Sequence, residues 1–364
     1  MGFFWRQLLN SKGLLGQDKE AKGFPSHGLK VFLTKSVCGI SGTVLCVSFI
    51  SDLRIQYIYR FTADELILLA QVLEIPDPFI TRSRFKFHAL EALCLLCARF
   101  KTAGDEYDVA LKYARSQSAI SEVVTKLVDF LDENWKHLLD FDHHHLLTPE
   151  NIAQYAQAIY RAGSRIQTVW AFLDCTLKQM CRPSRWQRQA YNGYKKYHAL
   201  KYQALGLPNG MIAHLFGPME GRRNDNALLE ESRLLEKARE HAIRPGANEN
   251  TPVEERYHQI FGDPAYGLSP VLISPFDGDK TAEQLEWNRD MSSVRMSVEH
   301  AFAIVLNHWP YLWAFWKHRV YASGIGQNYR VGVLLSNAIN CFRPNQTAQR
   351  YDCQPPTVEK YFIH

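Results

Sequence analysis

The segments VWAFLD (residues 169–174) and GDPAY (residues 262–266) decide how this chain is interpreted. In both segments an aspartate, Asp174 or Asp263, comes at or just after the end of an apolar run that has the length of a buried strand. A helical pattern from Met291 to Asn307 follows and carries Glu299. The sequence therefore predicts two aspartates at strand ends and a glutamate on a later helix.

Three carboxylates in this arrangement suit chemistry that uses two metal ions. Two divalent ions about 3.5–4 Å apart can bind the attacking and the leaving oxygen of a phosphodiester during an in-line displacement. Mg²⁺ takes oxygen ligands and keeps several waters, so a few carboxylates suffice to hold it. Each carboxylate also has a structural interpretation, because Asp174 and Asp263 could end strands in turns and Glu299 could pair with Arg295 one helical turn earlier. The pattern alone leaves both interpretations open.

Composition describes a globular chain without a membrane segment. Of the 364 residues 46% are hydrophobic, which allows a sizeable core and more than one domain. The formal net charge of +5 fits a nucleic-acid partner without requiring one. The longest apolar stretch, residues 37–50, is shorter than the ~20 residues of a membrane helix and is expected to form a buried strand. The sequence contains no phosphate-binding loop, dinucleotide fingerprint or Ser-His-Asp pattern.

Changes in composition and hydrophobic pattern divide the chain into four parts. Residues 1–80 form a leader of uncertain structure, residues 81–147 a helical region, residues 148–345 an α/β domain and residues 346–364 an irregular tail. In the helical region, a short helix, a polar turn at residues 115–118 and an amphipathic helix over residues 119–131 match a helix-turn-helix. An ordinary helical hairpin is the alternative.

The α/β domain has a recognisable order of elements. Thr148 and Pro149 begin a helix, and strands are expected over residues 166–173, 197–205, 211–216 and 257–261. The turn at residues 208–210 joins the second and third strands, and Asn224 or Asp225 caps a helix before the fourth. This order predicts a mixed sheet flanked by helices, as in the ribonuclease-H-like fold, whose first and fourth strands bring two aspartates to adjacent strand ends.

A basic segment rich in aromatic residues follows the first strand. Cations can bind the phosphates of a nucleic acid, and aromatic rings can stack on unpaired bases. A solvated basic loop is the alternative, but the position beside the carboxylates favours DNA. The cations of this segment, with two arginines that precede Asp225, are Arg182, Arg185, Arg188, Lys195, Lys196, Lys201, Arg222 and Arg223.

An ordered set of short motifs resembles the Harbinger-type DDE transposases and their domesticated nuclease relatives, especially the fungal branch. Any one of these motifs is weak, whereas their order and spacing together are specific. The motifs are FLDCT (172–176), CRPSR (181–185), YNGYKK (191–196), LKYQ (200–203), PNG (208–210), GPMEGRRND (217–225), GDPAY (262–266) and MSSVRMSVE (291–299).

The resemblance implies a metal-dependent DNA endonuclease or transposase. Asp174, Asp263 and Glu299 would hold Mg²⁺ or Mn²⁺, and Asp225 would be a further ligand or a neighbour of the metal site. The attacking group would be water or a DNA 3′-hydroxyl. The resemblance also implies action in the nucleus and a separate Myb-like partner protein. The oligomeric state is left open, with a homo-oligomer as one expectation.

Three positions depart from the family pattern. The family usually has Gly where this chain has Cys175, commonly has His where it has Asn224, and often has Trp where it has His300. None of these changes removes a carboxylate. They nevertheless keep a second hypothesis open, in which the chain is a domesticated, catalytically silent DNA-binding or scaffold protein.

Overall fold

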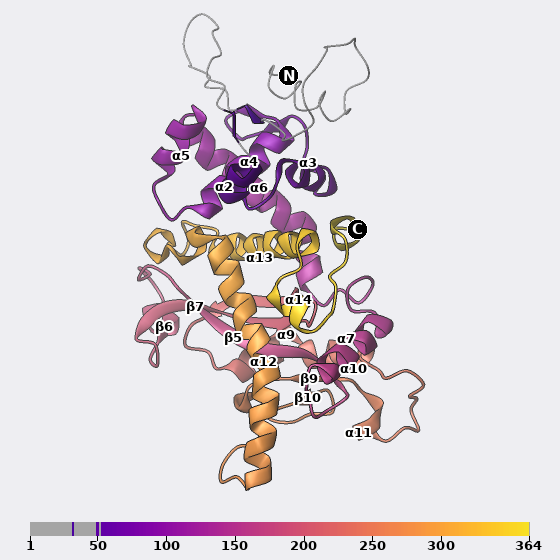
Figure 1. The fold of residues 1–364 in the computed structure, drawn as a ribbon. Helices are drawn as coiled ribbons and strands as arrows, with labels where there is room; N and C mark the ends of the chain where they lie inside the picture. The colour runs from indigo at the N-terminus through magenta and orange to yellow at the C-terminus, as the bar shows by residue number, and fades with distance from the viewer. Residues whose placement is uncertain (1–30, 33–48, 51, 364) are drawn as a thin grey trace, which may run out of the picture. The chain divides into compact units, whose positions relative to one another are not determined.

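The computed structural model describes residues 31–32, 49–50 and 52–363 of the chain (Figure 1). Most of the apolar stretch at residues 37–50 lies outside this part, apart from β2 (Phe49–Ile50), which pairs antiparallel with β1 (Val31–Phe32). The chain divides into two compact units, Met1–Leu127 and Val128–His364. Within the described residues, no helix combines the length and the apolar character needed to cross a membrane.

The first unit is mainly helical in its described part. The predicted leader already contains two helices, and the second of them begins with a capping box between Thr62 and Glu65. A three-residue connection joins the last two helices of this unit, as a helix-turn-helix requires, and binding of DNA by this region stays a prediction. The elements are α2 (Asp52–Tyr59), α3 (Ala63–Val72), β3 (Phe79–Ile80), β4 (Lys86–Phe87), α4 (Ala89–Lys101), α5 (Glu106–Tyr113) and α6 (Gln117–Trp135), which continues into the second unit.

The second unit is built on a six-stranded mixed sheet. Its centre is the antiparallel set of β5 (Val169–Gln179), β7 (Tyr197–Gly206) and β8 (Ile212–Glu220). On the other side of β5, β9 (Gln259–Phe261) runs parallel to it, and β10 (Leu272–Ile273) runs parallel to β9. The short β6 (Tyr191–Asn192) pairs with the start of β7. The order β8-β7-β5-β9-β10 confirms the predicted ribonuclease-H-like fold.

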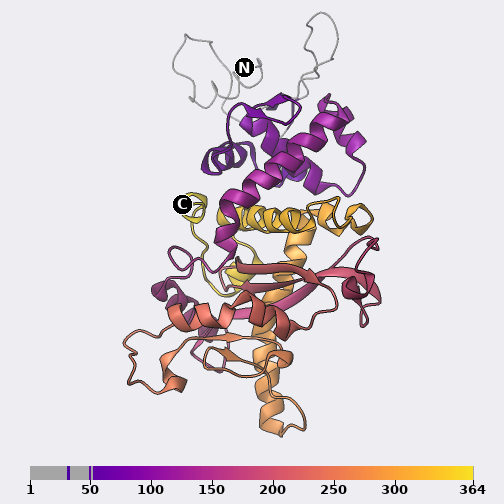
Figure 2. The same ribbon diagram turned by 180° about the vertical axis from the view of Figure 1, so that it is seen from behind.

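Helices cover both faces of this sheet (Figures 1 and 2). On one face lie α7 (Pro149–Arg161), α12 (Ala282–His308) and α13 (Ile325–Phe342), and a core cluster there joins Ile159, Phe172, Phe261 and Val294. On the other face lie α9 (Asp225–Ser232) and α10 (Leu234–His241). Gln203 of β7 is bound to this second layer, since its Nε2 donates to Ser232 Oγ at 3.0 Å.

Local signals in the sequence place several element boundaries. The side chain of Thr148 accepts a hydrogen bond from Asn151 N at 3.3 Å and begins α7. Asn224, rather than Asp225, is the N-cap of α9, because its Oδ1 accepts a hydrogen bond from Ala227 N at 2.8 Å. Gly210 in the β7–β8 turn has a φ of 79°, which favours glycine. The two cap side chains satisfy backbone amides of their helices, and Gly210 permits the turn because it has no Cβ.

The tail, which was expected to be irregular, contains two short helices, α14 (Gln346–Arg350) and α15 (Val358–Tyr361), with irregular residues between them. Tyr351 and Tyr361 are buried, and Tyr351 donates a hydrogen bond to the carbonyl oxygen of Val294. Asn337 of α13 donates to the hydroxyl of Tyr361 at 2.8 Å. These contacts bind the tail to the sheet layer, which local pattern could not reveal. The remaining elements are η1 (Lys136–Leu139), α8 (Gln187–Ala190), α11 (Val253–Arg256), η2 (Pro264–Tyr266), η3 (Pro310–Trp313) and η4 (Phe315–Lys317).

Candidate active site

Strand register brings Asp174 and Asp263 together. β5 and β9 pair in parallel with Phe172 opposite Phe261, and each aspartate lies two residues beyond that pair. β9 ends at Phe261, whereas β5 continues to Gln179 because β7 still pairs with it. The prediction that the first strand ends at Asp174 was therefore wrong. Asp174 lies within β5, at the point where the strand loses its partner on the β9 side.

Arg295 of α12 lies between the two carboxylates. Its Nη1 is 3.8 Å from Asp174 Oδ1, and its Nη2 is 3.7 Å from Asp263 Oδ2. Backbone amides orient both acids, because Cys175 N donates to Asp174 Oδ1 at 2.9 Å and Ala265 N donates to Asp263 Oδ1 at 3.1 Å. Two carboxylates thus share one guanidinium, and this group of three keeps a formal charge of −1.

Glu299 follows Arg295 by one turn of α12. Residues four positions apart lie on the same side of a helix, so the backbone directs this position to the layer that contains Arg295. The side chain of Glu299 itself is outside the described residues. Among the side chains that the structure does describe, no group of three or more His, Cys, Asp or Glu residues is arranged to hold a metal ion.

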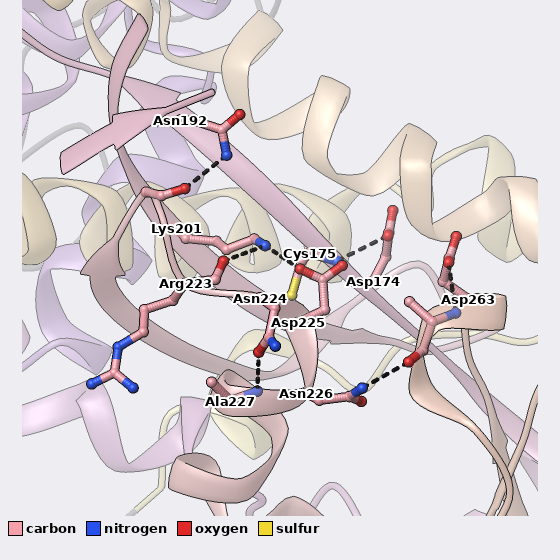
Figure 3. A network of polar contacts seen from close by, with 12 residues as sticks. Asp174, Cys175, Asn192, Lys201, Arg223, Asn224, Asp225, Asn226, Ala227 and Asp263 are labelled. Atoms are coloured by element: carbon pink, nitrogen blue, oxygen red, sulfur yellow. Dashed lines mark hydrogen bonds and ion pairs between the residues drawn. The ribbon is translucent and has the colours of Figure 1, made fainter. Parts of the chain in front are cut away.

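Asp225 is engaged on the opposite face of the sheet. Side chains alternate along a strand, and Lys201 lies opposite Leu177, so it projects to the α9 side whereas Asp174 projects to the α12 side. The ammonium of Lys201 forms an ion pair with Asp225 Oδ1 and donates to the carbonyl oxygen of Arg223 at 2.9 Å. In Figure 3 the carboxylates of Asp174 and Asp263 lie to one side of this pair. Asp225 is therefore neutralised by a cation of its own.

The side chain of Cys175 projects to the α9 side of the sheet, as does that of Lys201. Its sulfur is 3.1 Å from the hydroxyl of Tyr266. Burial, with the nearby charge of Asp225, raises the pKa of the Cys175 thiol to about 12, and burial also raises the pKa of Tyr266. Both groups stay protonated at neutral pH, so Cys175 is no nucleophile. Asn226 connects this side of the sheet to the loop after Asp263, because its Nδ2 donates to the carbonyl oxygen of Ala265 at 2.8 Å.

Of the eight basic residues expected to bind DNA, seven are exposed and one, Lys201, is buried. Lys201 is the exception, since its side chain is buried and its ammonium is paired with Asp225. Arg223 is exposed but lies 3.5 Å from Glu220 and 3.3 Å from Glu231. A surface hollow of about 410 Å³ is lined by Gln187, Arg188, Tyr191, Gly193, His198 and Arg222. The exposed members of the set are Arg182, Arg185, Arg188, Lys195, Lys196, Arg222 and Arg223.

The donor set at Asp174 and Asp263 fits a hard divalent cation. Carboxylate oxygens are the ligands that Mg²⁺ and Mn²⁺ prefer, and Arg295 already holds a positive charge between them. Sequence reasoning treated Arg295 only as a partner of Glu299. Its position in the motif MSSVRMSVE, one helical turn before Glu299, was the signal that it faces the same site.

Comparison with known proteins gives information on the family of one segment of the chain. No curated protein and no solved structure matches the chain. The match that is found is to a family model, that of the DDE superfamily endonucleases, over residues 173–334. This segment contains Asp174, Asp225, Asp263 and Glu299. The resemblance of this segment is thus supported at the level of the DDE superfamily endonucleases.

Proposed function

We propose that residues 128–364 act as a metal-dependent DNA endonuclease or transposase of the Harbinger type, with Asp174, Asp263 and Glu299 as the metal-binding residues. The observation that carries this proposal is the register of β5 and β9, which puts Asp174 and Asp263 side by side and against one shared cation. The match to DDE superfamily endonucleases supports phosphodiester cleavage as the reaction class.

The roles of the residues follow from their positions. Divalent metal ions, when bound, would activate the attacking water or 3′-hydroxyl and stabilise the leaving oxygen. Asp174 and Asp263 hold negative charge on oriented oxygens, and their amide partners keep the carboxylates aligned. The exposed cations of residues 182–196 and Arg222 bind the phosphate backbone of the DNA. Asp225 supports the site from behind the sheet by holding Lys201 in place.

Two of the three departures from the family pattern have structural explanations that fit an active protein. Asn224 fulfils the capping role at α9, and Cys175 contacts Tyr266 on the face away from the carboxylate of Asp174. Neither change removes a carboxylate of the candidate site. Action in the nucleus, a Myb-like partner and a homo-oligomer remain part of this proposal as expectations from the family.

Calorimetric binding of Mg²⁺ and Mn²⁺ to the full chain tests the proposal. We expect binding in the wild type and its loss in Asp174→Asn and in Glu299→Gln. Glu283→Gln is the matched control, because this exposed glutamate lies on the same helix near its start. Wild-type protein that binds neither metal, with or without DNA, would refute the enzyme and leave the silent DNA-binding protein as the better hypothesis.

A further inference from the structure

Two long segments of the second unit contain no carboxylate side chain. Residues 175–219 include no Asp or Glu but seven Lys or Arg residues, and residues 300–351 include no Asp or Glu but five. The carboxylates of this unit therefore lie in other segments. A surface formed by these two segments has the charge that a polyanion requires.

The two segments are bound to each other. Cys181 N donates to the carbonyl oxygen of His318 at 3.0 Å, and Cys181 Sγ donates to that of Phe315 at 3.2 Å. Met180 and Ile325 belong to one apolar cluster, against which Val320 packs. The segment between α12 and α13 lies beside β6 in both views of the molecule (Figures 1 and 2). The contact at Cys181 therefore places Arg182 of the first segment near Lys317 and Arg319 of the second.

This region exposes large aromatic side chains although its backbone is well packed. Trp309 and His318 are buried, and Trp309 Nε1 donates to Ser336 Oγ at 3.0 Å, so the segment is anchored on α13. From this anchored backbone Trp313, Trp316 and Tyr321 remain 61%, 54% and 73% exposed. In the other segment, residues 175–219, Trp186 and Tyr194 are 66% and 86% exposed. We call these five aromatic residues, with Lys317 and Arg319, the aromatic–basic surface.

Two of the exposed aromatic residues also have a positive φ, as do eight other non-glycine residues of the described chain. Trp186 has a φ of 58° and Tyr321 a φ of 71°, in the left-handed region that bulky residues rarely adopt. In both cases the strained residue presents its ring to solvent rather than to the core.

We propose that the aromatic–basic surface binds an unpaired DNA strand next to the bond that is cleaved. Aromatic rings stack on bases that have no partner, whereas the bases of a duplex are already stacked and shielded. The surface also begins near the site, because Lys178 of β5 places its ammonium 5.8 Å from the ring of Trp313. Lys178 lies four residues beyond Asp174 on the same face, a distance of roughly 13 Å along a strand. This inference rests on the proposed function for the identity of the polyanion.

Binding of fluorescein-labelled DNA to the full chain tests this surface. The probes are a single-stranded oligonucleotide of mixed sequence and its duplex, in EDTA so that cleavage and metal binding play no part. We expect Trp313→Ser combined with Trp316→Ser to weaken single-strand binding at least tenfold, since stacking of one base corresponds to roughly five- to 150-fold in Kd. Duplex binding should change less than threefold. Tyr160→Ser, an exposed aromatic position on α7, is the matched control and should leave both affinities unchanged.

Salt dependence separates stacking from charge. The double tryptophan variant should keep the wild-type slope of log Kd against log salt, whereas Lys317→Ala combined with Arg319→Ala should lower the single-strand slope by about 1.4. Equal single-strand affinity of wild type and the tryptophan variant would overturn the proposal. So would a wild-type dimer that the tryptophan variant converts to a monomer, because the surface would then join two copies of the chain. The assay needs no metal, so a chain that lacks nuclease activity can still bind the single strand through this surface. Failure of the proposed function and failure of this inference are therefore distinguishable.

Discussion

Two clusters on opposite faces of one sheet combine aspartates with a cation in different ways. On the α9 face Asp225 and Lys201 form a close one-to-one pair, and the lysine is buried. On the α12 face Asp174 and Asp263 share Arg295 at 3.8 and 3.7 Å, so negative charge remains. One carboxylate paired with one cation is formally neutral, whereas two carboxylates around one cation keep a formal charge of −1 that attracts a further cation. The contrast suggests different roles for Asp225 and for the pair Asp174 and Asp263 under the proposed function, although the sequence motifs treat all three alike.

The largest expected effect is on DNA cleavage in Mg²⁺. Asp174→Asn and Asp263→Asn should each lower the cleavage rate by about a hundredfold or more, because a lost metal ligand removes several kcal/mol of transition-state stabilisation. Asp225→Asn should lower the rate less than about tenfold. Initial rates on a supercoiled plasmid measure all three. Equal inactivation by Asp225→Asn would mean that Asp225 acts in the metal site itself.

The second prediction concerns the contribution of the Lys201–Asp225 ion pair to stability. Lys201→Met should lower the free energy of unfolding by about 1–3 kcal/mol, because Asp225 would keep its charge without its close partner. Urea denaturation monitored by fluorescence measures the change. Adding Asp225→Leu to Lys201→Met should restore part of the loss. A Lys201→Met variant as stable as the wild type would show that the pair contributes no net stability.

Lys178, on the face of Asp174, gives a pH-dependent prediction. Burial lowers the pKa of this lysine from 10.5 to about 7 in the folded protein. Between pH 7 and 10.5 the unfolded chain binds a proton on Lys178 that the folded chain lacks, so this group's contribution becomes more favourable as pH rises through that window. Below pH 7 both states are protonated, and the burial cost is fully present.

Lys178→Met removes that cost. The variant should be more stable than the wild type by about 1–3 kcal/mol at pH 6, and the difference should shrink by pH 10. Urea midpoints of both proteins at the two pH values are compared. The rings of Trp313 and Tyr329, 5.8 and 4.9 Å from the ammonium, favour its charged form. A variant less stable than wild type at pH 6 would show that these rings outweigh burial.

The smallest expected effect concerns Arg295, which lies between Asp174 and Asp263. Arg295→Gln should tighten Mg²⁺ binding roughly fivefold, because a unit charge at about 4 Å in water contributes about 1 kcal/mol of repulsion. Calorimetry measures the Kd, and Arg289→Gln, on the same helix, serves as a control for removal of a positive charge. Weaker binding would instead assign Arg295 the role of positioning the two carboxylates.

Local signals account for much of what could be predicted. Apolar runs and turn residues identified the four main strands and their order, since each run needs burial and each turn needs a particular backbone conformation. Caps at Thr148 and Asn224 fixed where helices begin. The strand order then sufficed to predict the ribonuclease-H-like sheet, because few topologies connect these elements without crossing. The helices of the first 80 residues and of the tail were missed, because their packing partners are distant in the sequence.

The sequence by itself determined the main strands of the α/β domain, their order and the motif positions of Asp174, Asp225, Asp263 and Glu299. The tertiary structure alone decided how the side chains are distributed between the faces of the sheet. Register sets Asp174 beside Asp263, α12 brings Arg295 to both, and β7 sends Lys201 to Asp225. These outcomes depend on contacts between residues tens of positions apart, whose energies no local window contains. A shift of one residue in register would move each side chain to the other face and dissolve both clusters.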